Sequence, residues 1–160
     1  MYIIEKYWGN YIGGTDDSLT LLEYLMDKKK AEISLSEIFT DIGLDKLNWN
    51  FRKTEPALVY TDQDGWESPF YYAIDVVTDL AALMLECKIN GDVSLMQLFY
   101  GKEGSVVCIS STQEEKAAII KVLDDFAKNP LAYDLTEMVP DDDMREMAQV
   151  CENLCKELCE

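Results

Sequence analysis

The chain has 160 residues, of which 48% are hydrophobic and 11% aromatic, a composition that excludes an intrinsically disordered acidic tail. Its 31 Asp and Glu residues outnumber 14 Lys and Arg residues, which gives a formal net charge of -17 without any histidine. Such a field repels nucleic acid and anionic membranes and accelerates encounter with a basic partner, and the missing histidine excludes histidine-based catalytic triads and metal sites.

The N-terminal region is predicted to form a strand followed by a helix. Residues 2–8 are rich in aromatic and β-branched side chains and alternate as strands do. In the glycine-rich stretch WGNYIGGTDDS, Thr15, Asp16 or Asp17 can cap the following helix. Because two aspartates occupy the helix N-terminus, this turn disfavours a bound phosphate. The expected apolar stripe of the helix comprises Leu19, Leu22, Leu25 and Met26.

The next segment is predicted to contain a short helix and two strands. The capping-box spacing S-x-x-E at 34–37 predicts a helix that ends at Gly43. Residues 47–51 and 57–60 have strand patterns, the first strictly alternating. They precede an acidic loop, TDQDGWESP, at 61–69.

The most apolar part of the chain, residues 73–87, is predicted to be a central buried helix. Asp75, Asp79 and Glu86 are expected to mark its only solvent-exposed side, although a strand remains an alternative for its first half. Residues 93–100 fit neither pattern clearly.

The C-terminal part alternates a strand with two helices. Residues 105–110 predict a strand, the capping box at 112–115 starts a helix that stops at Asn129-Pro130, and an acidic helix runs from about 141 to 159. No repeat or linker divides the chain. We therefore expect one α+β domain over residues 1–160, with a small, mostly antiparallel sheet packed against about five helices.

The cysteines and acidic residues do not form a recognisable metal site. Cys151, Cys155 and Cys159 stand one helical turn apart, so the outer two lie about 12 Å apart along the axis and neighbouring Cβ atoms lie about 5–6 Å apart, beyond disulfide reach. Cys151 fits an apolar stripe with Met144, Met147, Leu154 and Leu158 and is expected in the core. The D-x-D-G pattern at 62–65 lacks the later ligands of a calcium loop. No metal ion or cofactor is expected.

Several acidic positions have the composition of a protein interface. The loop residues Asp62, Asp64, Trp66 and Glu67 combine an aromatic ring with carboxylates. The alternative is a turn whose Trp66 folds back onto the core. The other residues predicted to contact a partner are Asp16, Asp17, Asp141, Asp142 and Asp143.

The charge is unevenly distributed along the chain. Residues 137–160 contain eight acidic and two basic side chains, whereas residues 1–30 contain five acidic and four basic ones. This imbalance favours a directed field over a uniform solubilising coat.

Three segments, WGNYIGGTDDSLTLLEYL, AIDVVTDLAALMLE and INGDVSLMQLF, resemble immunity proteins of bacterial contact-dependent growth inhibition, the CdiI-type partners of polymorphic toxins. The resemblance implies a non-enzymatic antitoxin that binds and neutralises a cognate toxin C-terminal domain, very often a basic ribonuclease or deoxyribonuclease. It carries over a role and no residue positions.

The sequence also bears on where the protein acts and leaves two alternative functions open. The N-terminus MYIIEKYWGN lacks a secretory signal, no apolar run reaches the roughly 20 residues that span a bilayer, and five cysteines agree with a reducing compartment, so a cytoplasmic protein is expected. A carboxylate-dependent, magnesium-assisted hydrolase around Asp75, Asp79 or the acidic loop remains an alternative. An adaptor that docks a basic partner through its acidic final helix is another.

Overall fold

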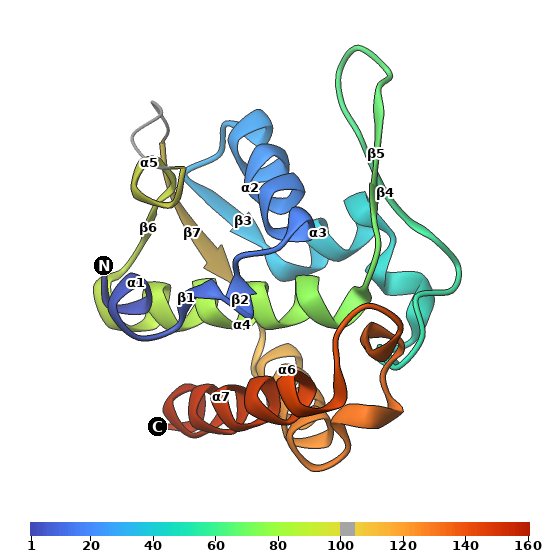
Figure 1. Cartoon of the computed structure of the whole chain (residues 1–160). Helices are drawn as coiled ribbons and strands as arrows, with labels where there is room; N and C mark the ends of the chain where they lie inside the picture. The colour runs from blue at the N-terminus through green and yellow to red at the C-terminus, as the bar shows by residue number, and fades with distance from the viewer. Residues whose placement is uncertain (100–104) are drawn as a thin grey trace.

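The computed structural model describes residues 1–99 and 105–160. A long central helix, α4 (Ala73–Asn90), separates the short strands and N-terminal helices from a pair formed by α6 (Gln113–Lys128) and α7 (Asp141–Cys159) (Figure 1). The described residues form seven α-helices and three small sheets, which confirms the predicted α+β class. None of these helices combines the length and apolarity required to cross a membrane.

The core is built around α4, whose residues are buried without interruption from Ala73 to Glu86. The predicted central buried helix is thus confirmed. The expectation that Asp75, Asp79 and Glu86 mark a solvent-exposed side is wrong, because they are 4%, 0% and 0% exposed. Segments distant in the sequence cover these carboxyls, and an apolar pattern within one helix carries no information about them.

The N-terminal residues form a helix, α1 (Tyr2–Lys6), where a strand was predicted. The backbone N–H groups of Tyr2 and Ile3 donate to the Glu86 carboxylate over 3.3 and 3.0 Å. A carboxylate at this position satisfies N–H groups that a helix N-terminus leaves free. The strand prediction fails because this partner lies 84 residues away.

The predicted helix after the glycine-rich turn is α2 (Asp16–Lys28), and its start is confirmed. The Thr15 hydroxyl accepts a hydrogen bond from the Ser18 N–H over 3.1 Å, as part of a capping box. Leu19 was expected in the apolar stripe, but it is 49% exposed, so this part of the prediction is wrong. The apolar residues that α2 buries are Leu21, Leu22, Tyr24 and Leu25.

The short helix α3 (Leu35–Ile42) also follows its prediction. The Ser34 hydroxyl accepts from the Glu37 N–H over 3.0 Å, and the helix ends at Gly43, whose φ of 96° suits glycine.

The predicted strand at 47–51 is wrong. A 3₁₀ turn, η1 (Leu44–Leu47), leads into Asn48 and Trp49, whose φ angles of 53° and 62° are left-handed. The rings of Trp49 and Phe51 lie 5.8 Å apart in an aromatic cluster. The alternation therefore reflects ring packing in a turn, since left-handed residues cannot continue a strand.

Two of the three sheets have two strands each. β1 (Trp8–Asn10) pairs in parallel with β2 (Ile12–Gly13) beside α4. β4 (Leu58–Thr61) and β5 (Glu67–Phe70) form an antiparallel hairpin that extends away from the body of the molecule (Figure 1).

The third sheet joins three segments. β7 (Val106–Ser110), in the predicted 105–110 strand, pairs in parallel with β3 (Glu32–Ser34) and antiparallel with β6 (Val93–Ser94). The short helix α5 (Leu95–Leu98) follows β6. The strands are thus divided among three small sheets, where one sheet was expected.

The C-terminal helices α6 and α7 lie side by side and close the core below α4 (Figure 1). Thr112 and Glu115 form the predicted capping box at the start of α6. Two 3₁₀ turns, η2 (Pro130–Ala132) and η3 (Asp134–Glu137), connect the helices. The predicted buried stripe of α7 is confirmed for Met144, Met147, Cys151, Leu154 and Leu158.

Candidate partner-binding surface

The β4–β5 hairpin presents the acidic loop to solvent. At its turn, the Asp62 carboxylate Oδ1 accepts the N–H groups of Asp64 and Trp66, both over 2.9 Å. Gly65 adopts a φ of 85°, which a side chain would strain. Trp66 is 76% exposed and Glu67 is exposed beside it, so the alternative in which Trp66 folds back onto the core is wrong.

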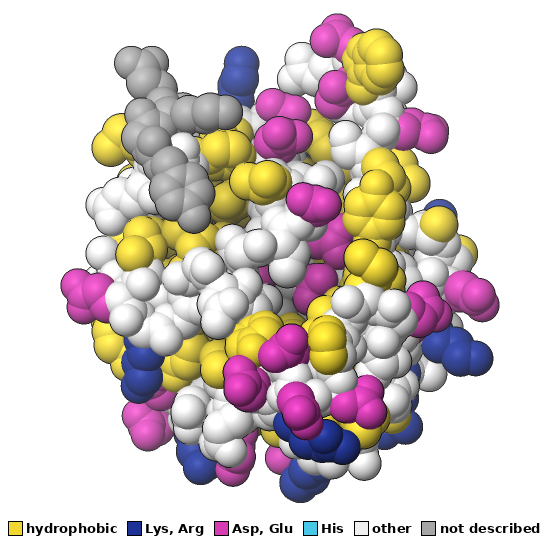
Figure 2. Space-filling model, in the orientation of Figure 1, with side chains coloured by type: hydrophobic (Ala, Val, Ile, Leu, Met, Phe, Trp, Pro, Cys, Tyr) yellow, Lys and Arg dark blue, Asp and Glu magenta, His cyan; other side chains and the backbone are white. Residues whose placement is uncertain are grey.

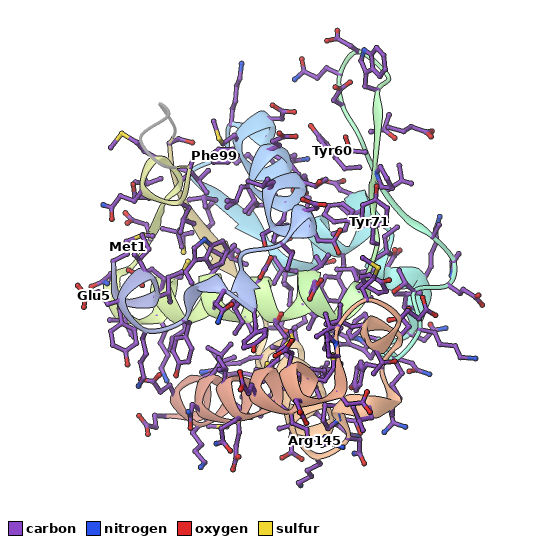
Figure 3. The ribbon with its side chains drawn as sticks, in the orientation of Figure 1. Met1, Glu5, Tyr60, Tyr71, Phe99 and Arg145 are labelled. Carbon is purple, nitrogen blue, oxygen red and sulfur yellow. The ribbon has the colours of Figure 1, made fainter. Side chains whose placement is uncertain are left out.

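Asp17 fastens the base of this hairpin to α2. Its two carboxylate oxygens accept the N–H groups of Tyr71 and Tyr72 over 2.9 and 3.0 Å. Asp17 is 2% exposed, whereas its neighbour Asp16 is exposed. Burial raises the pKa of Asp17 and the two backbone hydrogen bonds oppose that shift. In the free chain Asp17 therefore positions Tyr71, which Figure 3 labels beside the hairpin.

A cavity of about 480 Å³, here called the hairpin-base pocket, opens where the hairpin meets the body. Its apolar lining comprises Tyr71, Tyr72, Leu135, Met138 and Val139. Its acidic lining comprises Asp16, Asp17 and Asp75. Tyr71 and Met138 are 60% and 73% exposed, so the apolar rim of the pocket faces solvent. The pocket combines apolar walls with carboxyl groups, as ligand sites often do.

Asp75 occupies this pocket without a hydrogen-bond partner for its side chain in the described part of the chain. It is 4% exposed. Burial, followed by the charges of Asp79, Asp17 and Asp134, raises the pKa of Asp75 to about 8. A carboxyl group with this pKa is largely protonated at neutral pH.

Asp79, one turn further along α4, is satisfied from within the chain. The Gly13 N–H and the Ser18 hydroxyl donate to its two oxygens over 2.7 and 2.5 Å. Burial raises the pKa of Asp79 to about 7, although both hydrogen bonds oppose the shift. The glycine-rich turn thus donates a hydrogen bond to an internal carboxyl group, where such turns in other proteins bind an external anion.

The acidic start of α7 adjoins the same region. Val139, which lines the pocket, lies two residues before Asp141. The Tyr11 hydroxyl donates to Glu146 over 2.7 Å and lies 3.4 Å from Asp143, and the hydrogen bond to Glu146 raises the pKa of Tyr11 to about 12. Of the residues predicted from sequence, Asp16 and Asp17 line the hairpin-base pocket, Asp141 follows its lining residue Val139 closely in the chain, and the loop at 62–67 lies at the far end of the hairpin.

Most ion pairs lie elsewhere on the molecule. Lys28 contacts Glu37 and Asp41 over 2.8 and 2.9 Å, and Lys30 contacts Glu37 over 2.7 Å. Among the nine predicted contact residues, all within the described chain, Asp142 alone has such a partner, Arg145 at 3.2 Å.

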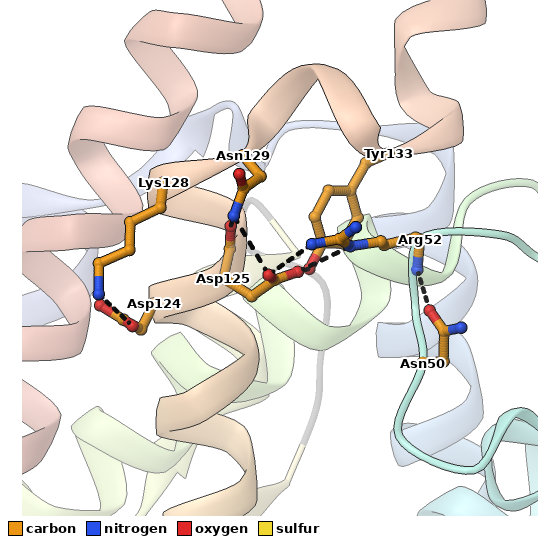
Figure 4. A network of polar contacts seen from close by, with 7 residues as sticks. All are labelled: Asn50, Arg52, Asp124, Asp125, Lys128, Asn129 and Tyr133. Carbon is orange, nitrogen blue, oxygen red and sulfur yellow. Dashed lines mark hydrogen bonds and ion pairs between the residues drawn. The ribbon is translucent and has the colours of Figure 1, made fainter.

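The α6 side shows how cations are paired away from the pocket. Arg52 donates to both oxygens of Asp125 over 3.0 and 2.7 Å, and the Tyr133 hydroxyl donates to the same carboxylate over 2.6 Å (Figure 4). Arg52 holds the pKa of Asp125 below its usual value. Lys128 pairs with Asp124 over 2.8 Å.

As a result, one face of the molecule is predominantly anionic. Asp and Glu side chains extend from the tip of the hairpin, through the hollow at its base, toward α7, while Lys and Arg lie mainly at the margins of the view (Figure 2). We call this the acidic face and define it by Asp16, Asp62, Asp64, Trp66, Glu67, Tyr71, Met138, Asp141, Asp142 and Asp143. Within residues 1–99 and 105–160, no group of three or more acidic or cysteine side chains is placed to hold a metal ion.

Sequence reasoning did not single out Asp75, Tyr71 and Met138 as members of one site. Tyr71 belongs to an aromatic run beside the acidic loop, which is a usable signal. Met138 and Asp75 carry no comparable local signal, because only the fold places them at one pocket.

Comparison with known proteins gives one finding that covers almost the whole chain. The model of a family described as Immunity protein 68 (Imm68) matches residues 3–158. Searches of curated proteins and of solved structures gave no match. The matched range includes the hairpin, the hairpin-base pocket and α7.

Proposed function

Because the chain belongs to the Immunity protein 68 family, we propose that it neutralises a cognate toxin by binding the toxin domain directly through the acidic face. The family supplies the immunity role. The acidic face supports the choice of surface, because it joins exposed aromatic and apolar groups to carboxylates that mostly lack internal cationic partners. The test is whether the purified chain binds the toxin domain encoded beside its gene and abolishes that domain's activity.

We propose further that the toxin is a basic nuclease. A nuclease must present cationic groups to its nucleic acid substrate, and a net charge of -17 attracts the same groups. Carboxylates and rings on the acidic face would then occupy positions that phosphates and bases otherwise take. Delivery by a contact-dependent inhibition system and action in the cytoplasm belong to the same proposal and rest on the resemblance described above.

Charge reversal on the acidic face is expected to slow association with the toxin. In the triple variant Asp64→Lys, Glu67→Lys and Asp142→Lys, we expect the association rate at low salt to fall at least about tenfold, because long-range attraction governs encounter. The difference should shrink as salt screens the charges. Stopped-flow association at several salt concentrations measures both effects.

The matched control reverses three exposed carboxylates outside the acidic face, Glu5, Glu32 and Asp92. It has the same net charge as the first variant, and Figure 3 shows Glu5 on the side of the molecule opposite the hairpin. Equal association rates for the two triple variants would mean that net charge alone acts and that the acidic face is not the binding surface.

The hydrolase alternative is tested by metal binding. A catalytic magnesium ion held at Asp75 would stabilise the folded chain by mass action. Because Asp79 is already bound to Gly13 and Ser18, we expect millimolar magnesium to leave the melting temperature unchanged. A rise in melting temperature that Asp75→Asn abolishes would instead favour the hydrolase.

The adaptor alternative has less support, because α7 contributes its apolar stripe to the core. α7 is therefore part of the folded body and not a separate docking segment, although its acidic start belongs to the acidic face.

A further inference from the structure

We infer that the hairpin-base pocket receives one lysine or arginine side chain of the toxin, with its methylene stem between Tyr71 and Met138 and its charged head at Asp75. The inference rests on the proposed function and specifies the contact that anchors the complex. It is carried by the hydrogen bonding of Asp75, by the chemistry of the pocket walls and by the charges that surround the pocket.

Asp75 differs from the other buried acidic residues of the described chain in having no side-chain hydrogen bond. Asp17 accepts two backbone N–H groups, Asp79 accepts Gly13 and Ser18, and Glu86 accepts the N-terminus of α1. Buried polar groups in native proteins are nearly always paired. Asp75 is only 4% exposed, and it lines the pocket. A donor that enters the pocket from outside can therefore supply the missing hydrogen-bond partner.

The charges around Asp75 select a cationic donor. Asp17 on α2, Asp79 on α4 and Asp134 on η3 all raise its pKa, and no Lys or Arg is among the groups that act on it. The Oδ1 atom of Asp134 is itself buried without a partner in the described residues. Burial raises the pKa of Tyr72 and of Cys151 on α7, and the charge of Asp75 adds to the shift of each. A neutral donor would satisfy one hydrogen bond, but a cation also offsets the surrounding carboxyl groups.

The walls of the pocket suit the stem of a long basic side chain. Lys and Arg bury their methylene groups against apolar surface while their charged heads find polar partners. Met138 is an adaptable apolar contact, and the exposed ring of Tyr71 can stack on a guanidinium or ammonium group.

Such insertion couples toxin binding to proton release. The pKa of Asp75 near 8 keeps it largely protonated in the free chain at neutral pH. A cation lowers that pKa, so the complex holds Asp75 ionised and releases its proton. Binding should therefore strengthen as pH rises from about 6 to about 8, by up to about tenfold per pH unit.

The decisive experiment compares the parent chain with Asp75→Asn, using as probe the purified, catalytically inactivated toxin domain encoded beside the immunity gene. Calorimetry in two buffers of different ionisation enthalpy gives both affinity and protons released. We expect Asp75→Asn to lose at least about tenfold in affinity near pH 8 and to lose less near pH 6. It should release about half a proton fewer than the parent near pH 8 and about one proton fewer near pH 6. Asp92→Asn, the same change at an exposed position near the far end of α4, should match the parent in all three readouts.

A second variant tests the pocket wall without touching a buried group. Met138→Ser removes a largely exposed side chain, so it should fold normally and still weaken toxin binding several-fold. If the parent binds the toxin and Asp75→Asn binds equally tightly with the same proton release, the inference is overturned while the proposed function stands. If the parent does not bind the toxin at all, the proposed function itself fails.

Discussion

Replacement of Asp17 by alanine is expected to lower the free energy of unfolding by about 3 kcal/mol, because it leaves two backbone N–H groups without their acceptor. Those groups belong to Tyr71 and Tyr72 and lie 2.9 and 3.0 Å from the Asp17 carboxylate. The same change releases the base of the hairpin from α2. Urea unfolding of the variant and the parent measures the loss of stability.

The adjacent residue provides a matched control for this substitution. Asp16 is exposed, and its side chain makes no hydrogen bond to another described residue, so Asp16→Ala should cost less than about 1 kcal/mol, mainly through the helix dipole. Similar losses for the two variants would show that the hydrogen bonds of Asp17 do not hold the hairpin. A stability loss for Asp17→Ala together with unchanged toxin affinity would show that the position of Tyr71 is irrelevant to binding.

Substitution of Asp75 by asparagine is expected to stabilise the free protein, by about 5 kcal/mol near pH 8. The pKa of Asp75 is about 8 in the folded chain, well above its unfolded value, so the folded state binds the proton more tightly. The contribution of this group to stability is therefore greatest at low pH and is lost as pH rises toward 8. Asparagine does not ionise, so the gain over the parent should be small near pH 4 and grow with pH.

Denaturant unfolding of Asp75→Asn and of the parent between about pH 4 and pH 8 measures that difference. Both proteins contain Asp79, so its own titration cancels in the comparison. Asp92→Asn should show no pH-dependent gain, since its side chain is exposed. A constant offset between Asp75→Asn and the parent at every pH would contradict a raised pKa. Asp75→Asn is thus expected to raise the stability of the free protein and to weaken toxin binding. If Asp75 had a purely structural role, the same substitution would lower both stability and toxin affinity.

Local signals in the sequence located most of the helices. Ser34 and Thr112 each cap a helix as predicted, and Thr15 is the cap among the three candidates at 15–17, because a cap depends on residues only three positions apart. The long apolar segment likewise became α4. The strand predicted at 2–8 failed because the Glu86 carboxylate stabilises a helix there, and the strand at 47–51 failed because its rings pack in a turn.

The candidate site was only partly visible in the sequence. The composition of the acidic loop predicted that Trp66 and its neighbouring carboxylates contact a partner; the structure exposes the Trp66 ring, and the contact itself stays a prediction. The hairpin-base pocket was not found, because it forms where Asp17 meets a backbone N–H group 54 residues away and where the segment before α7 closes over them.

The sequence by itself determined the net charge, the absence of histidine and the starts of α2, α3 and α6, all of which follow from residue identity or short spacing. Only the tertiary structure decided which carboxyl groups face solvent and which are internal. Asp16 and Asp17 are neighbours with opposite surroundings, and Asp75 and Asp79 share a helix but differ in their hydrogen bonds. The reason is that the state of a carboxyl group depends on donors and apolar cover brought from distant segments, which a local pattern cannot encode.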